Sequence, residues 1–364
     1  MSATEKLAEL LGTAIGKNDE ASQVSIWLDT GFAPLNKAVS GRYDGGLPCG
    51  RIVEIFGPES SGKTAIATAV MISAQQAGGI AAFNDHERSF SERLGAANGL
   101  DLTPGRWIYK KPETYEQSLE IFASAVSVIR ESKLIPPSAP IVWVFDSLAS
   151  MIPGSTSGKD FSKLNMNDSS ALARVTSNTM KNVALLTEKY NVCVIFLNQI
   201  REKIGVMFGD PTTTPGGKAL KFYASVRIQL GASAISVGSG EDKMVVGSQV
   251  KAVCKKNKVN RPFLSANWSF LFKEDGSGYF DRVGSVLDFM VKQKIVDSGT
   301  QGRVMWGGKA LHKKDAILAI EAAGGIEVLN KILTARDVEL AEDEEVKATT
   351  LDEEREEAAA GLAV

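Results

Sequence analysis

Residues 57–64 have the composition and spacing of a phosphate-binding loop. The pattern G-x-x-x-x-G-K-[ST] is met by Gly57-Pro58-Glu59-Ser60-Ser61-Gly62-Lys63-Thr64, and Ala65 opens the helix that follows. An apolar strand, 51–56, enters the loop. Glycines let backbone N–H groups converge on phosphate oxygens, and the helix N-terminus adds positive potential. We expect Lys63 to reach the β- and γ-phosphates of a nucleotide and Thr64 to ligate Mg²⁺.

Polar residues follow two further apolar strands. Asp146 closes the strand 141–145, where a carboxylate is expected to help hold Mg²⁺ beside a phosphate loop. The amides Asn198 and Gln199 end the strand 192–197. A neutral amide at that point can bond a γ-phosphate and lose the bond after hydrolysis, so the pair is a candidate sensor.

A carboxylate is also needed to orient the attacking water. Glu87 follows the apolar strand 80–83 and is a candidate for this role. Position alone leaves Asp85 and Glu54 as competitors.

Two long segments follow the strands that end in Asp146 and in the amide pair Asn198-Gln199. The segment 200–217 is rich in Gly, Pro and Thr, with apolar and basic residues interleaved, and 153–170 is rich in Ser, Gly, Lys and Asn. Long irregular segments inside compact domains are usually functional. Arg201 and Lys203 suit phosphates, and the apolar side chains suit base faces. Together the two segments predict a channel that binds single-stranded nucleic acid. The alternative is that both are ordinary surface loops.

The elements that position these residues indicate an α/β fold. Continuously apolar strands alternate with helical stretches through the main domain, 32–279, which is typical of a parallel sheet buried on both faces. Ligands then bind beyond the carboxyl ends of the strands. The pattern also predicts helices over 65–71, 115–130 and 171–189 and further strands over 222–230, 245–254 and 267–272.

The two ends of the chain look different from this domain. Residues 1–31 contain an amphipathic helix, 6–15, whose apolar stripe packs either on a neighbouring subunit or on its own domain. Residues 280–335 read as a small C-terminal α/β lobe with helices over 286–291 and 313–320. The remainder, 336–364, is an acidic tail that we expect to be disordered.

Composition restricts the class of protein. The 364 residues are 44% hydrophobic and 23% charged, as in a globular protein, without a signal peptide pattern or a membrane-spanning run. Three scattered cysteines and two histidines argue for the cytoplasm and against a zinc or disulfide framework. The chain carries −2, but residues 337–364 hold eleven acids and two bases, so the body carries +7. A basic body suits a polyanionic partner.

Three blocks of sequence resemble the RecA family of homologous-recombination proteins. They are the run 45–64 through the phosphate loop, the run 198–214 that begins at the amide pair, and Gly216-Gly217-Lys218-Ala219-Leu220-Lys221-Phe222-Tyr223-Ala224-Ser225-Val226-Arg227. The resemblance implies a RecA-like P-loop ATPase core with an N-terminal oligomerisation helix. It also implies a DNA-dependent ATPase that uses ATP and Mg²⁺ and forms a helical filament on single-stranded DNA. The filament pairs that strand with homologous duplex DNA in recombination, repair and the SOS response.

The resemblance also implies roles for single residues. Glu87 matches the water-activating glutamate, Asp146 the Walker B position and Gln199 the γ-phosphate sensor. Lys256 and Lys258 match a pair that reaches the neighbouring subunit's ATP. The segments 153–170 and 200–217 match the two DNA-binding loops, and Lys221, Phe222 and Arg227 lie on the stretch that contacts the next subunit. The DNA contacts implied are Arg174, Arg201, Lys203, Ile204, Gly205, Val206, Met207, Phe208, Gly216 and Gly217.

Other functions stay open from the sequence. A hexameric ring ATPase, such as a helicase, has the same core but predicts a distinct N-terminal domain and closed symmetry. A nucleotide-switched DNA-binding protein predicts that hydrolysis serves release only. Single-strand-binding and mediator proteins are implied partners, and the location implied is the cytoplasm, or the host cytoplasm if the chain is phage-encoded.

Overall fold

The computed structural model describes residue 2, residues 4–7, residue 13 and the ranges 23–159, 170–202, 212–273 and 278–339. Several predicted features fall outside these residues. They are most of the N-terminal helix, the middle of the segment 153–170, the acidic tail from 340 onward, and Lys203, Ile204, Gly205, Val206, Met207 and Phe208. In the part of the chain that is described, no helix has the length and apolar character needed to cross a bilayer.

A nine-stranded sheet forms the centre of the molecule, in the order β13-β12-β11-β10-β3-β7-β6-β4-β5. The strands from β10 to β5 pair in parallel, and β10 to β13 continue the sheet in antiparallel fashion. The strands are β3 (Arg51–Gly57), β4 (Ile80–Asp85), β5 (Trp107–Lys110), β6 (Ile141–Asp146), β7 (Val192–Gln199), β10 (Val226–Val237), β11 (Met244–Asn257), β12 (Ser265–Phe272) and β13 (Gly278–Asp281). The mostly parallel α/β sheet expected from the sequence is confirmed.

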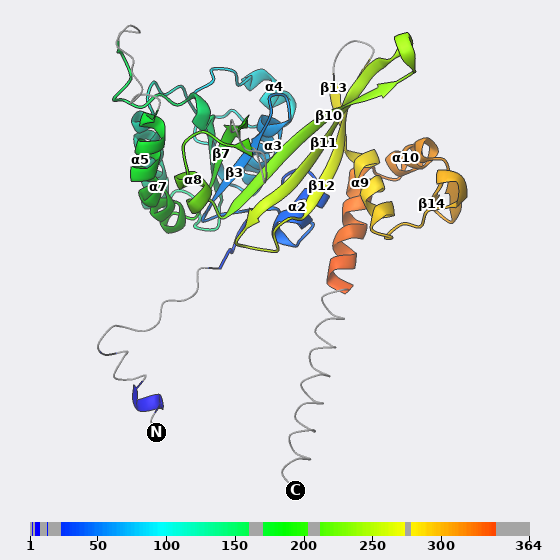
Figure 1. The fold of residues 1–364 in the computed structure, drawn as a ribbon. Helices are drawn as coiled ribbons and strands as arrows, with labels where there is room; N and C mark the ends of the chain where they lie inside the picture. Colours follow the sequence, from blue (N-terminus) through cyan, green and yellow to red (C-terminus); the bar gives the residue numbers. More distant parts are fainter. Residues whose placement is uncertain are drawn as a thin grey trace.

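Helices cover both faces of this sheet (Figure 1). One face packs on α2 and α3, and the other packs on α5, α7 and α8. The helices are α2 (Ala33–Ser40), α3 (Lys63–Gln76), α4 (Glu92–Ala97), α5 (Tyr115–Glu131), α7 (Ala171–Lys189) and α8 (Ala219–Tyr223). The expected helices 65–71, 115–130 and 171–189 are confirmed as α3, α5 and α7.

The central strands are apolar on both faces because both faces are covered. Val142 and Val144 of β6 join the core beneath α3, while the alternate residues Trp143 and Phe145 join the core beneath α5 and α7. On that second face Phe145 stacks on Phe196 of β7, with ring centroids 4.6 Å apart. Period-two alternation between two cores explains why these strands read as continuous apolar runs.

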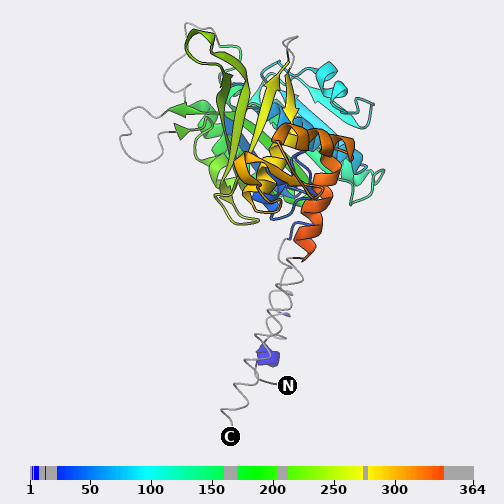
Figure 2. The same ribbon diagram turned by 90° about the vertical axis from the view of Figure 1, so that its right-hand side faces the viewer.

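The strand predicted over 222–230 begins later than expected. Residues 219–223 form helix α8, and β10 starts at Val226 after the Ser225 N–H donates to the Ile52 carbonyl of β3. The aromatic pair Phe222-Tyr223 has high strand propensity, which misled the sequence prediction. Strands β10 and β11 form a long ribbon that projects beyond the rest of the sheet (Figures 1 and 2).

The C-terminal residues form a smaller group of elements beside β12. These are α9 (Arg282–Lys292), the β14 (Val304–Trp306) and β15 (Lys309–Leu311) hairpin, α10 (Lys313–Ala322) and a helix over 326–339. Their apolar side chains belong to the same buried cluster as α2 and α3. Lys37 of α2 forms an ion pair with Asp337 at 2.6 Å, which ties the last described helix to the core.

Candidate nucleotide site at the carboxyl edge of the sheet

The phosphate loop joins β3 to α3 and has a strained, open shape. Ser60 and Gly62 have φ angles of 56° and 88°, in the left-handed region, a conformation that lets successive N–H groups converge on an anion. The Ser61 hydroxyl donates to the Pro58 carbonyl at 2.7 Å and braces the turn. A side chain at Gly57 would approach the Leu230 carbonyl of β10 to 2.7 Å, so a glycine is required there.

The Lys63 side chain folds back onto this loop. Its Nζ donates to the carbonyls of Gly57 at 3.1 Å and Pro58 at 2.7 Å. Burial lowers the pKa of Lys63, while the carboxylates of Asp146, Glu87 and Glu59 oppose that shift. Phosphate oxygens would replace neutral carbonyls with charged acceptors, which an ammonium group prefers. The loop therefore fits the triphosphate of a nucleotide.

Thr64 and Asp146 meet next to the lysine. The Thr64 hydroxyl donates to Asp146 Oδ2 at 3.2 Å. Burial, followed by the nearby Glu87 carboxylate, raises the pKa of Asp146 to about 7. A buried carboxyl that is hard to ionise for these reasons is stabilised in its charged form by a cation.

The residues present fit a magnesium ion that arrives with the nucleotide. Among the described residues no group of three or more His, Cys, Asp or Glu side chains forms a metal site. Mg²⁺ is usually held by one or two protein oxygens together with substrate phosphates and waters. Thr64 and Asp146 supply such a partial set of ligands.

Glu87 is an exposed residue two positions after the end of β4, at the same edge of the sheet. Its Oε1 accepts hydrogen bonds from the Ser147 hydroxyl at 2.5 Å, the Ser150 hydroxyl at 3.4 Å and Gln199 Nε2 at 3.3 Å. The N–H of Glu87 donates to the Asp146 carbonyl at 3.2 Å, which fixes the turn that carries it. A fixed, solvent-accessible carboxylate suits a role in orienting water.

The two competing carboxylates are buried and occupied. Asp85 accepts hydrogen bonds from the Tyr109 hydroxyl at 2.7 Å and the Phe90 N–H at 3.1 Å. Glu54 has no exposed surface and pairs with Arg227. Of the three candidates, Glu87 alone is exposed.

Asn198 and Gln199 close the edge on the β7 side. Gln199 Nε2 reaches Glu87, so the candidate sensor and the candidate water-orienting group are already in contact. Beyond them, β8 (Arg201–Glu202) pairs with β9 (Thr212–Thr213), so the two ends of the segment 200–217 lie side by side. Gly216 has a φ of 83° and packs against Leu148, which follows Asp146.

The other predicted DNA contacts lie around this segment. Arg174, on the first turn of α7, and Arg201 are both exposed. Gly217, with a φ of 75°, packs against Ala173 one residue before Arg174.

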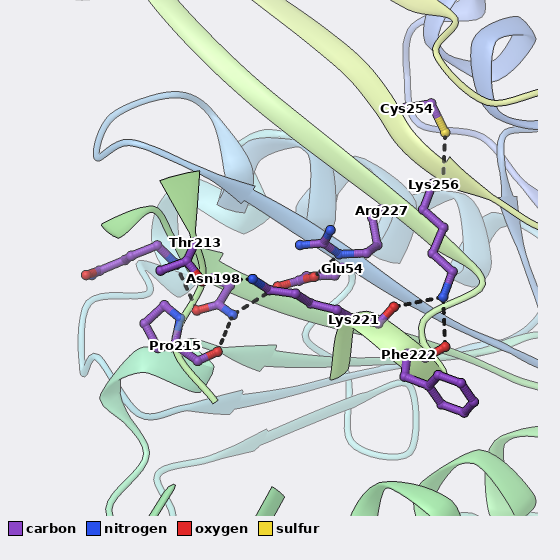
Figure 3. A network of polar contacts seen from close by, with 10 residues as sticks. Glu54, Asn198, Thr213, Pro215, Lys221, Phe222, Arg227, Cys254 and Lys256 are labelled. Carbon is purple, nitrogen blue, oxygen red and sulfur yellow. Dashed lines mark hydrogen bonds and ion pairs between the residues drawn. The ribbon is translucent and has the colours of Figure 1, made fainter. Parts of the chain in front are cut away.

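Three of the predicted interface residues, Lys221, Phe222 and Lys256, lie together at α8 (Figure 3). Arg227 lies apart from them, paired with Glu54 and over the Phe56 ring. Lys256 Nζ donates to the carbonyls of Lys221 and Phe222, at 2.7 Å each. Burial, then the charges of Lys258 and Arg227, lower the pKa of Lys256 to about 8. Phe222 is 68% exposed, and Lys258 Nζ lies 5.8 Å from its ring centroid.

Sequence reasoning missed the residues that support the site. Ser150 contacts Glu87, and Thr213 accepts a hydrogen bond from Lys221 Nζ at 2.8 Å. Ser150 carries no sequence signal of its own, and Thr213 lies in the predicted segment 200–217 without a signal that sets it apart there. The acidic Glu54 inside the apolar strand 51–56 did carry one, because a buried carboxylate requires a partner.

Known proteins resemble most of this chain. A family model described as the RecA N-terminal domain matches residues 12–277. Protein RecA of Geobacter sulfurreducens is 40% identical over 279 residues, which cover 77% of this chain and 75% of that protein. Protein RecA of Citrifermentans bemidjiense is 39% identical over 280 residues, with 77% and 76% covered. Protein RecA of Chlamydia trachomatis serovar L2 is 35% identical over 285 residues, with 78% and 74% covered.

Replacing Lys63 by alanine tests the phosphate loop. We expect Lys63→Ala to weaken ATP binding by about 10- to 100-fold, because a charged hydrogen bond contributes ~1.5–3 kcal/mol. Isothermal titration with ATP and Mg²⁺ measures the change. Lys309→Ala, on the β15 strand of the C-terminal hairpin, is the control and should bind normally. Equal affinity in both variants would contradict the phosphate-loop assignment.

Proposed function

The chain belongs to the RecA family, and from this premise we propose that it is an ATP-dependent DNA recombinase that forms a helical filament on single-stranded DNA. Membership assigns the chain to recombination and repair, with a DNA-dependent ATPase activity. The filament, homologous pairing with duplex DNA and strand exchange are the finer steps that we propose.

One observation carries the ATPase assignment. Strands β3, β7, β6 and β4 are adjacent and parallel, and each delivers one chemical group to the same edge of the sheet. These groups are the phosphate loop with Lys63, the sensor Gln199, the Mg²⁺ partner Asp146 and the carboxylate Glu87. We assign them to phosphate binding, γ-phosphate detection, metal binding and water activation. Mg²⁺, when bound, supplies charge neutralisation at the β- and γ-phosphates.

The same edge supports DNA binding. The segments 153–170 and 200–217 both leave the sheet there, after β6 and β7 respectively. We propose that Arg174 and Arg201 contact the DNA backbone, together with the predicted residues 203–208 and the glycines 216 and 217. Basic groups contact phosphates and apolar groups contact bases in such channels. The +7 charge of the body favours the association.

An exposed face at α8 supports the proposal of filament assembly. Phe222 offers an apolar side chain, and Lys256 and Lys258 add positive charge beside it. We propose that this face, with Lys221 and Arg227, meets the nucleotide edge of the next protomer. The lysines then stabilise the transition-state charge from the neighbour. A head-to-tail contact of this kind continues into a helix unless its rotation closes a ring.

Electron microscopy with single-stranded DNA and a slowly hydrolysed ATP analogue tests the filament. We expect continuous helical coats that need both the nucleotide and the DNA. DNA binding should weaken steeply between 50 and 200 mM salt, by about 10³-fold or more for six or more phosphate contacts. Closed six-fold rings would favour the helicase alternative, and a protein that stays monomeric would refute the proposal.

Replacing Glu87 by glutamine tests the water-activating role. We expect Glu87→Gln to keep ATP affinity within about twofold and to lower hydrolysis by about 10²-fold or more, because an amide cannot accept the proton. Phosphate release in the presence of DNA measures the rate. Glu92→Gln, an exposed glutamate on α4, is the control. If Glu87→Gln hydrolyses ATP at the normal rate, another group activates the water.

The pKa of Lys256 gives a pH test of the trans contact. In the free protomer this pKa is about 8, so the positive charge is lost as the pH rises through 8. A neighbouring phosphate favours the charged form, so assembly above pH 8 takes up a proton. We expect the ATP-dependent assembly constant to fall by up to about tenfold per pH unit above 8. Lys256→Arg stays protonated and should remove this slope; identical slopes in sedimentation assays would exclude the contact.

A further inference from the structure

Glu54 places a carboxylate inside the protein, in the middle of β3. The residue has no exposed surface, and its neighbours along the strand are apolar core residues. A carboxylate in such a place is retained only if it is paired and hydrogen-bonded. The groups that bind Glu54 therefore indicate which parts of the structure it keeps in position.

The two oxygens of Glu54 bind groups from two different strands (Figure 3). Oε1 accepts a hydrogen bond from Asn198 Nδ2 of β7 at 3.0 Å, and Oε2 accepts one from Arg227 Nε of β10 at 2.5 Å. Glu54 and Arg227 are direct register partners across the parallel β3–β10 pair. The central strand thus connects the sensor strand on one side to the strand of the proposed interface arginine on the other.

Asn198 uses every polar atom of its amide. Its Nδ2 donates to Glu54 and also to the Pro215 carbonyl at 3.2 Å, while its Oδ1 accepts from the Gln199 N–H at 3.0 Å. The amide therefore clamps the two ends of the segment 200–214, since Gln199 precedes the segment and Pro215 follows it. Glu54 fixes the orientation of this clamp, because only the NH₂ side of the amide can face a carboxylate.

Arg227 is the second partner of Glu54, and its side chain extends to a cavity. Its guanidinium lies over the Phe56 ring, 4.5 Å from the centroid, and its side chain is 14% exposed. It lines a cavity of about 290 Å³. The remaining lining residues are Phe56, Thr212, Thr213, Thr214, Lys221, Lys255 and Phe263. The cavity therefore borders both the far end of the segment 200–217 and the proposed subunit face.

We propose that Glu54 is a positioning residue that couples the γ-phosphate sensor to the proposed DNA segment and to the interface arginine. This inference rests on the proposed function. Gln199 leaves Glu87 for a γ-phosphate when ATP binds, and the backbone that it shares with Asn198 follows. The buried carboxylate cannot lose either partner without leaving a charge unpaired, so Asn198, Pro215 and Arg227 move together.

The variant Glu54→Gln separates this role from simple packing. Glutamine has almost the same shape, but it offers one acceptor and one donor to two groups that both donate. Either Asn198 or Arg227 loses its acceptor, and the charge is gone. We expect stimulation of the ATPase by single-stranded DNA to fall by about tenfold. Affinity for ATP, KM for ATP and the DNA-independent rate should stay within about twofold, a split that general loss of structure does not produce.

Glu188→Gln is the matched control. Glu188 lies 4.0 Å from Arg51, the first residue of the same strand, but its side chain is 54% exposed. The substitution makes the same chemical change on α7, in an exposed ion pair with the first residue of β3, and should leave DNA stimulation unchanged. Normal stimulation in Glu54→Gln, measured beside this control, overturns the inference.

A second variant, Glu54→Asp, and a measurement of DNA stimulation in the wild-type chain complete the test. Should Glu54→Gln fail to fold, Glu54→Asp retains the charge but is one methylene too short to serve both partners. Reduced DNA stimulation in Glu54→Asp at a normal melting temperature supports the coupling, and wild-type stimulation overturns it. A wild-type chain that shows no DNA stimulation at all instead refutes the proposed function, so the two failures are distinguishable.

Discussion

Parallel pairing of four strands is the constraint on which the rest of this structure depends. Because β3, β7, β6 and β4 run in one direction at a spacing of about 4.8 Å, the residues after them meet at one edge. Groups separated by more than a hundred residues, from Lys63 to Gln199, therefore share one site. The helices on the two faces make this arrangement possible, since they keep water from strands that are apolar on both sides.

The charged groups at this edge are placed to bind a charged ligand. Asp146 and Glu87 bring two carboxylates close together, and burial makes the first hard to ionise. The ammonium group of Lys63 donates hydrogen bonds to two carbonyls of its own loop. The nucleotide and metal that we propose for this site would bring an anion to the lysine and a cation to the carboxylates. On the other side of β3, Lys258 and Arg227 lie close enough to Lys256 to lower its pKa, and we have proposed this cationic group as the contact for a neighbour's nucleotide.

The sequence predicted the elements better than the contacts between them. Apolar runs and a phosphate-loop motif placed β3, β4, β6 and β7 correctly because two covered faces leave an unmistakable pattern. The start of β10 was wrong, since Phe222 and Tyr223 have strand-like propensity but complete a helical turn. The Glu54–Arg227 pair was not predictable, because it depends on parallel register between residues 173 positions apart. The tether of Lys256 to the α8 carbonyls likewise depends on tertiary packing.

The β8–β9 pair has a consequence for how this protein can change. Arg201–Glu202 and Thr212–Thr213 hold the two ends of a chain segment together, and the Asn198 amide secures the base beneath them. The distance between these two ends is therefore set by the pair and not by the residues that connect them. Their number and identity can vary at a small entropic cost, because closure of a loop depends only weakly on its length. A connection of different length can therefore be joined to the same two strands without displacing the Asn198 amide beneath them.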